Sequence, residues 1–140
     1  LAVARENACK LLTDEHASIF FEQLDALDQS SWFRGERYHV LVSNPPYIGL
    51  QESPSLARDL QYEPSGALFA QNEGLQFYYM YSQYAKQVLF DRGRIFVEVS
   101  PHLANKVHKI FSDCGWQDVC ITKDYSQNLR VVSCVKPADR

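Results

Sequence analysis

Four consecutive residues, Asn44, Pro45, Pro46 and Tyr47, have the types and the spacing to hold a nitrogen group in place. The side-chain oxygen of Asn44 and the carbonyl of Pro45 are two hydrogen-bond acceptors, enough for both N–H bonds of a primary amide or amino group. The two prolines restrict the backbone and remove competing N–H donors, and Tyr47 offers a flat face to a planar group. The tetrapeptide can therefore align such a nitrogen with an activated methyl group, which a weak nucleophile requires.

The residues before this tetrapeptide predict how it is positioned. Tyr38–Val42 is β-branched and aromatic, which favours a buried parallel strand covered on both faces. The prolines cannot continue its hydrogen-bond ladder, so Asn44 should stand just beyond the carboxyl end of the strand, where open α/β sheets bind ligands. The alternative is that Asn44 only starts a rigid loop, since Asn before Pro is common in turns.

Apolar spacing and turn residues divide the rest of the chain into helices and strands. In chain order, we predict a helix over residues 1–12, a short strand at Ile19–Phe21, the strand Tyr38–Val42, a loop over 48–72, a helix over 75–89, a strand at Ile95–Val99, a helix over 100–114, and strands at Trp116–Thr122 and Val131–Val135. The last two strands should be antiparallel, because the link Lys123–Arg130 is too short for a helical crossover. This order predicts an α/β fold with a mostly parallel sheet and an antiparallel terminal hairpin.

Local signals predict the boundaries of the two later helices. Asp91-Arg92-Gly93 should form the turn after the helix over 75–89. Ser100 is expected to be the N-cap of the next helix, with Pro101 at its first position and Gly115 as the C′ glycine. Loops as long as the one over 48–72 are usually either functional or disordered.

Composition disfavours several classes of protein. The 140 residues are 46% apolar, which is enough for a core. The net charge is -3, so the chain does not have the excess of basic residues that is typical of nucleic-acid-binding proteins. No apolar run approaches the roughly 20 residues of a membrane span. The four cysteines and four histidines show no metal-binding spacing, so we expect no metal and a reducing compartment, the cytoplasm or alternatively the mitochondrial matrix.

Several motifs together resemble one family of enzymes. They are Val42-Ser43-Asn44-Pro45-Pro46-Tyr47-Ile48, Tyr62-Glu63-Pro64 with Ala67-Leu68, Asn72-Glu73-Gly74-Leu75 with Tyr78, and the ending from Lys123 to Val131. The chain resembles the HemK/PrmC family, the peptide chain release factor glutamine methyltransferases, which are class I S-adenosylmethionine-dependent methyltransferases. The resemblance implies a Rossmann-like sheet of order 3-2-1-4-5-7-6 and methyl transfer to the glutamine N5 of a release factor's Gly-Gly-Gln motif.

The resemblance also implies roles for single residues. Asn44 and the Pro45 carbonyl would act in catalysis by binding the glutamine amide, with Pro46, Tyr47 and Glu63 on the substrate side. Glu63-Pro64 can equally be a plain turn. The family's strand-end glutamate matches Glu98, which is followed by Val99-Ser100 where we expect a glycine, so a direct role is not assigned to it.

S-adenosylmethionine is the cofactor that the resemblance implies. Asp25 would contact its adenine amino group and Asn44 would face its methyl group, although an aspartate in a polar loop is usually just solvated. No G-x-G-x-G is present, and the chain opens within a helix and without a methionine. We therefore expect residues 1–140 to be the carboxy-terminal part of the methyltransferase domain, with the amino-terminal strands, the glycine-rich loop and the amino-terminal substrate-docking domain missing, and to be inactive alone.

Two other functions remain open at this point. The shared N-P-P-Y motif also fits an adenine-N6 methyltransferase acting on RNA or DNA, although the acidic balance disfavours it. A non-catalytic methyltransferase fragment is the second alternative. The expected partner is a release factor, with no membrane and no direct nucleic-acid contact.

Overall fold

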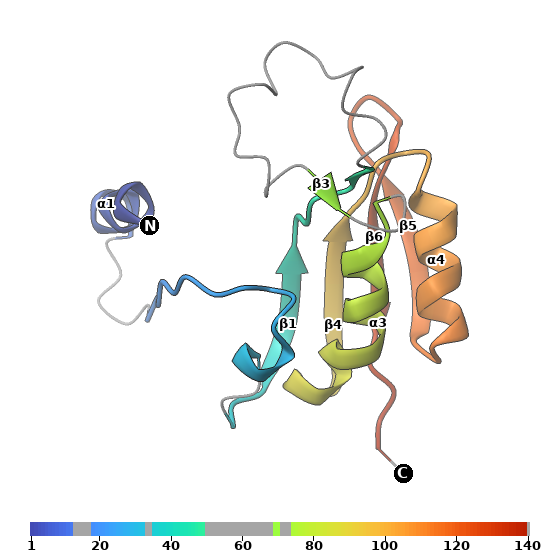
Figure 1. Cartoon of the computed structure of the whole chain (residues 1–140), viewed down its shortest axis with the longest axis horizontal. Coiled ribbons are helices and arrows are strands. Elements are labelled where there is room, and N and C mark those ends of the chain that lie inside the picture. Colours follow the sequence, from blue (N-terminus) through green and yellow to red (C-terminus); the bar gives the residue numbers. More distant parts are fainter. Residues whose placement is uncertain (13–17, 33–34, 50–68, 71–73, 140) are drawn as a thin grey trace. The chain divides into compact units, whose positions relative to one another are not determined.

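The computed structural model describes residues 1–12, 18–32, 35–49, 69–70 and 74–139. The chain divides into two compact units, Leu1–Trp32 and Phe33–Arg140, which are described separately. Figure 1 shows the elements of both. None of the helices in the described ranges has the length and hydropathy that crossing a bilayer requires.

The first unit contains the helix α1 (Ala2–Leu11) and the short 3-10 helix η1 (Gln29–Ser31). The predicted opening helix is confirmed. The strand predicted at Ile19–Phe21 is wrong: this segment is not a strand, and Phe20 is 87% exposed. A strand must satisfy its N–H and C=O groups through a neighbour, and no described strand pairs with this segment.

The second unit is built on a four-stranded sheet of order β1-β4-β6-β5. The strands are β1 (Tyr38–Ser43), β4 (Leu89–Glu98), β5 (Gln117–Lys123) and β6 (Leu129–Val135). β1 and β4 are parallel, and β6 is antiparallel to both β4 and β5, so three of the four strands run in one direction. The predicted mostly parallel sheet with an antiparallel terminal hairpin is confirmed, and the order matches the 4-5-7-6 part of the implied sheet.

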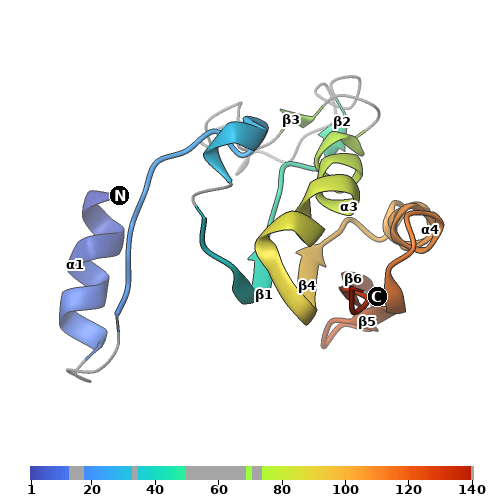
Figure 2. The same cartoon turned by 90° about the horizontal axis from the view of Figure 1, so that it is seen from below.

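The helices α3 (Gln76–Val88) and α4 (Ala104–Asp113) cover one face of this sheet (Figures 1 and 2). Beneath them, Ile95 and Val97 of β4 are fully buried. The prediction that Tyr38–Val42 is covered on both faces is wrong, because Val40 is 51% and Val42 75% exposed. β1 is an edge strand among the described residues. Because successive side chains of a strand point to opposite faces, Val40 and Val42 point to the face that α3 and α4 leave open.

The predicted boundaries of α3 and α4 are partly right. α3 ends at Val88 and β4 begins at Leu89, so the expected turn at Asp91-Arg92-Gly93 lies inside the irregular opening of β4, where Arg92 has a φ of 62°. Ser100 is not the N-cap: α4 begins at Ala104, and the Ser100 hydroxyl bonds Nδ1 of His102 at 2.8 Å. That local hydrogen bond competes with capping.

The end of α4 follows the prediction. Gly115 has a φ of 75° and donates its N–H to the carbonyl of Ser112, while Trp116 donates to the carbonyl of Phe111. These two bonds form a Schellman motif, which needs a residue in the left-handed conformation at C′. Gly115 is therefore the C′ glycine that the sequence predicts.

Within the range predicted as a loop, the described residues form a second, two-stranded sheet. Its strands, β2 (Ile48–Gly49) and β3 (Phe69–Ala70), pair in parallel. Residues 50–68, which include Glu63, and residues 71–73 lie outside the described residues.

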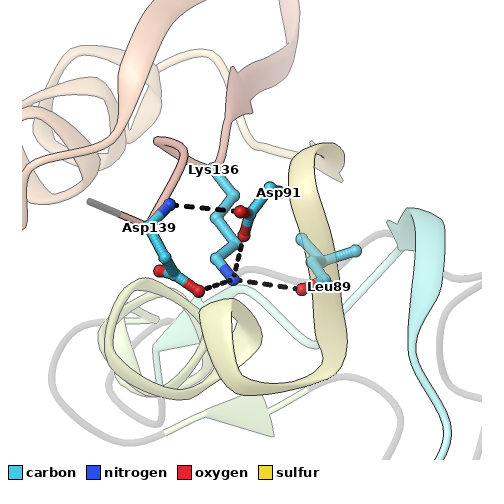
Figure 3. Close-up of polar contacts among 4 residues, drawn as sticks. All are labelled: Leu89, Asp91, Lys136 and Asp139. Atoms are coloured by element: carbon cyan, nitrogen blue, oxygen red, sulfur yellow. Dashed lines mark hydrogen bonds and ion pairs between the residues drawn. The ribbon is translucent and has the colours of Figure 1, made fainter.

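The opening of β4 is tied to the carboxy-terminal tail by a cluster of charged groups around Lys136 (Figure 3). Lys136 is only 5% exposed, and its ammonium bonds the carbonyl of Leu89 at 3.3 Å and pairs with Asp91 at 3.0 Å and Asp139 at 3.3 Å. The N–H of Asp139 donates to the second carboxylate oxygen of Asp91 at 3.2 Å. We call these four residues the Lys136 cluster; every donor of the buried ammonium has an acceptor there.

Candidate functional site

The candidate site lies at the carboxyl end of β1. The last strand pairing joins Ser43 to Val97 of β4, and Asn44 follows immediately. Asn44 is exposed, Pro45 is buried, and Pro46 and Tyr47 are half-buried. The amide of Asn44 is therefore open to a ligand while the proline beside it is fixed in the protein.

A tyrosine of α3 holds the residue before Asn44. The hydroxyls of Ser43 and Tyr81 are 2.7 Å apart, and either can be the donor. Tyr81 is 4% exposed, and burial raises its pKa above the ordinary value although the hydrogen bond with Ser43 acts in the opposite direction. Tyr81 therefore stays protonated at neutral pH and keeps a hydroxyl next to the end of β1.

The backbone before α3 holds the other end of the motif. Gly74 has a φ of 84°, and a Cβ placed on it would overlap the carbonyl oxygen of Tyr47 and lie 3.2 Å from Cδ1 of Leu103. Both the left-handed conformation and this close approach require glycine. The main chain of Tyr47 is thus packed directly against the start of α3.

A second buried tyrosine ties α3 to the end of β4. The hydroxyl of Tyr78, which is fully buried, donates to the carbonyl of Glu98 at 2.8 Å. Burial, followed by the nearby Tyr47, Tyr81 and Glu98, raises the pKa of Tyr78 far above the usual range. Tyr78 is a neutral donor at any physiological pH, and Glu98 contributes its backbone carbonyl to this contact.

The predicted site residues are not all in one unit. Asn44, Pro45, Pro46 and Tyr47 belong to the second unit, whereas Asp25 belongs to the first. There, the Asp25 carboxylate accepts the N–H of Leu27 at 2.9 Å.

The chemistry of the described side chains also bears on metal binding. Within the described ranges, no group of three or more histidine, cysteine, aspartate or glutamate side chains could hold a metal.

Sequence reasoning missed the residues that hold the motif in place. Ser43, Gly74 and Tyr78 enter the sequence analysis only as parts of the family motifs, and Tyr81 is not singled out there. Tyr78 and Tyr81 are buried core residues, and their hydroxyls also bind Glu98 and Ser43. The available signal was that a buried tyrosine hydroxyl needs a partner.

Comparison with known proteins finds methyltransferases among the sequence relatives of this chain. No family model matches the chain. The release factor glutamine methyltransferase of Buchnera aphidicola is 39% identical over 104 residues, which are 73% of this chain and 38% of that protein. That of Clostridium acetobutylicum is 38% identical over 104 residues, 74% of this chain and 36% of that protein. A bifunctional methyltransferase of Rickettsia bellii is 34% identical over 136 residues, 94% of this chain and 23% of that protein.

Among solved structures, a release-factor-specific protein-(glutamine-N5) methyltransferase from Alicyclobacillus acidocaldarius is similar, with a TM-score of 0.48 and 29% identity. The match covers 74% of this chain and 52% of that one. The chain thus spans between about a fifth and two fifths of the curated relatives named above.

The sheet order, the N-P-P-Y motif at the end of β1 and these sequence relatives define a class I methyltransferase fold. Within that class, the chain is homologous to the release factor glutamine methyltransferases, as its motifs predicted.

Proposed function

We propose that this chain is the carboxy-terminal part of a methyltransferase domain in a longer protein. That protein would transfer a methyl group from S-adenosylmethionine to the glutamine N5 of the Gly-Gly-Gln motif of a peptide chain release factor. The observation that carries the proposal is the Asn44-Pro45-Pro46-Tyr47 sequence at the end of β1, in a chain whose sequence relatives are methyltransferases of this kind.

The motif has the acceptors that an amide nitrogen needs. The Asn44 side-chain oxygen and the Pro45 carbonyl would accept the two N–H bonds of the glutamine amide, leaving one face of the nitrogen open. Tyr47 would pack against the planar amide, with Pro46 and Glu63 shaping the substrate side. No base is needed before transfer, because the proton can leave the nitrogen for water once the N–C bond has formed.

The residues of this chain fit only parts of the cofactor. Asp25 is an acceptor for the adenine amino group, and Asn44 would lie beside the methyl group; when bound, S-adenosylmethionine supplies that methyl group in activated form. The 140 residues contain no G-x-G-x-G for the rest of the molecule. We therefore expect the isolated chain to bind S-adenosylmethionine weakly or not at all and to be inactive, and tight binding in calorimetry would contradict this.

The reaction would take place in a reducing compartment, the cytoplasm or the mitochondrial matrix. The four cysteines are all free thiols. This is typical of proteins that do not depend on disulfides.

The test uses the whole natural protein with radiolabelled S-adenosylmethionine. Release factor, RNA and DNA are offered separately, to wild type and to Asn44→Ala, with Asn105→Ala on the exposed side of α4 as the matched control. We expect labelling of release factor alone, reduced about 100-fold or more in Asn44→Ala because a positioned hydrogen-bonding group is lost, and unchanged in Asn105→Ala. Labelling of nucleic acid would favour the adenine-N6 alternative, and no labelling by a folded, cofactor-binding protein would favour a non-catalytic role.

A further inference from the structure

The pairing between β1 and β4 stops one residue before Asn44. Among the described strands, β1 pairs only with β4, and this pairing stops at Ser43. Asn44 lies beyond the last of these pairings, so contacts made outside the ladder bear on its position.

One such contact is the hydrogen bond between Ser43 and Tyr81. It joins the last residue of β1 to the middle of α3 across 2.7 Å. Tyr81 is 4% exposed, and its ring lies beside that of Phe77, with centroids 6.4 Å apart. A buried aromatic ring has few rotamers available, so its hydroxyl is a rigid point of attachment.

We propose that Tyr81 is a positioning residue for Asn44: through the hydroxyl of Ser43 it fixes the end of β1, and with it the acceptors of Asn44 and Pro45. This inference rests on the proposed methyl transfer to a glutamine amide. Tyr81 acts through Ser43 and is not assigned a contact with the substrate. Its loss should therefore change the alignment of the amide more than the binding of the release factor.

Small misalignments lower reaction rates steeply because the reacting atoms must meet in line. A single neutral hydrogen bond corresponds to a factor of roughly 3 to 10. We therefore expect Tyr81→Phe and Ser43→Ala each to lower kcat by roughly 3- to 10-fold, with KM for the release factor within about twofold of wild type. The double variant should be no worse than either single variant, because both remove the same bond.

Two controls separate positioning from general damage to α3. Ser43→Thr keeps a hydroxyl and should retain most of the wild-type kcat. Tyr84→Phe removes a hydroxyl from the same helix without touching Ser43, and should leave both kinetic constants unchanged.

Hydrogen exchange in the whole protein gives a readout that does not depend on the substrate. In Tyr81→Phe, the amides of Ser43 and Asn44 should exchange faster than in wild type, with no change in Tyr84→Phe. Unchanged exchange, or additive losses of kcat in the double variant, would overturn the role of Tyr81. Failure of wild type to methylate a release factor would instead overturn the proposed function, while the exchange experiment would still decide whether Tyr81 fixes the end of β1.

Discussion

At the carboxyl ends of β1 and β4, the hydroxyls of two buried tyrosines bond neutral groups. At the opening of β4, a buried ammonium pairs with two carboxylates. In the first region, Tyr81 bonds Ser43 and Tyr78 bonds Glu98. In the second, Lys136 bonds Asp91 and Asp139. We therefore expect the two tyrosine contacts to be independent of pH in mild acid and the Lys136 cluster to depend on charge.

The largest effect should come from changing Gly74, because the Tyr47 main chain leaves no room for a side chain. Gly74→Ala combines a left-handed backbone with a clash against the Tyr47 carbonyl, and should lower the free energy of unfolding by at least ~2 kcal/mol. Gly115→Ala is the matched control: it has the same sign of φ, but its Cβ would meet only the flexible Lys86, at 3.8 Å. It should cost about 1 kcal/mol.

Denaturant unfolding of both variants measures this difference. Equal losses would mean that the clash with Tyr47 is relieved, and that Gly74 contributes only its conformation. Methyl transfer should also fall more in Gly74→Ala than in Gly115→Ala, since only the first displaces the candidate site.

An intermediate effect is expected for Lys136, which organises the opposite end of the sheet. Lys136→Met keeps a long apolar chain but leaves Asp91, Asp139 and the Leu89 carbonyl without their donor. We expect a loss of about 1–3 kcal/mol in the free energy of unfolding. The control is Lys109→Met, because the pair between Lys109 and Asp113 is exposed on both sides and should contribute less than about 0.5 kcal/mol. Similar losses in both variants would show that the burial of Lys136 adds nothing.

The smallest effect is the acid dependence of the Lys136 cluster. The hydrogen bond from Lys136 holds the pKa of Asp91 below its ordinary value of ~3.9. Its contribution to stability is therefore complete above that ordinary pKa and is lost as pH falls through the lowered one. Unfolding at a series of pH values should show a shallower acid loss in Asp91→Asn than in wild type, whereas Tyr81→Phe should parallel wild type. A parallel curve for Asp91→Asn would contradict a charge-dependent end of the sheet.

Local sequence patterns predicted the elements whose contacts are near in the chain. The apolar run before Asn44 predicted β1, and the short link Lys123–Arg130 predicted that β5 and β6 are antiparallel. Gly115 predicted the end of α4. Each of these features is decided by neighbouring residues, so spacing and residue type were sufficient. The family resemblance added the strand order.

Features that depend on distant partners were not predictable in the same way. The strand expected at Ile19–Phe21 failed because strand propensity does not supply a neighbouring strand. Ser100 is of a residue type that often caps helices, but its hydroxyl forms a hydrogen bond with Nδ1 of His102. The contact between Ser43 and Tyr81 joins residues 38 positions apart, and no spacing in the sequence indicates it.

The central claim is that the acceptors at Asn44 and Pro45 direct a methyl group to a glutamine amide nitrogen. The most direct measurement is fragment-ion mass spectrometry of a release factor after incubation with the whole protein and S-adenosylmethionine. The account predicts one added methyl group on the side-chain nitrogen of the Gly-Gly-Gln glutamine, absent when Asn44→Ala replaces wild type. A methyl group on another residue of the release factor, or the same modification by Asn44→Ala at the wild-type rate, would contradict it.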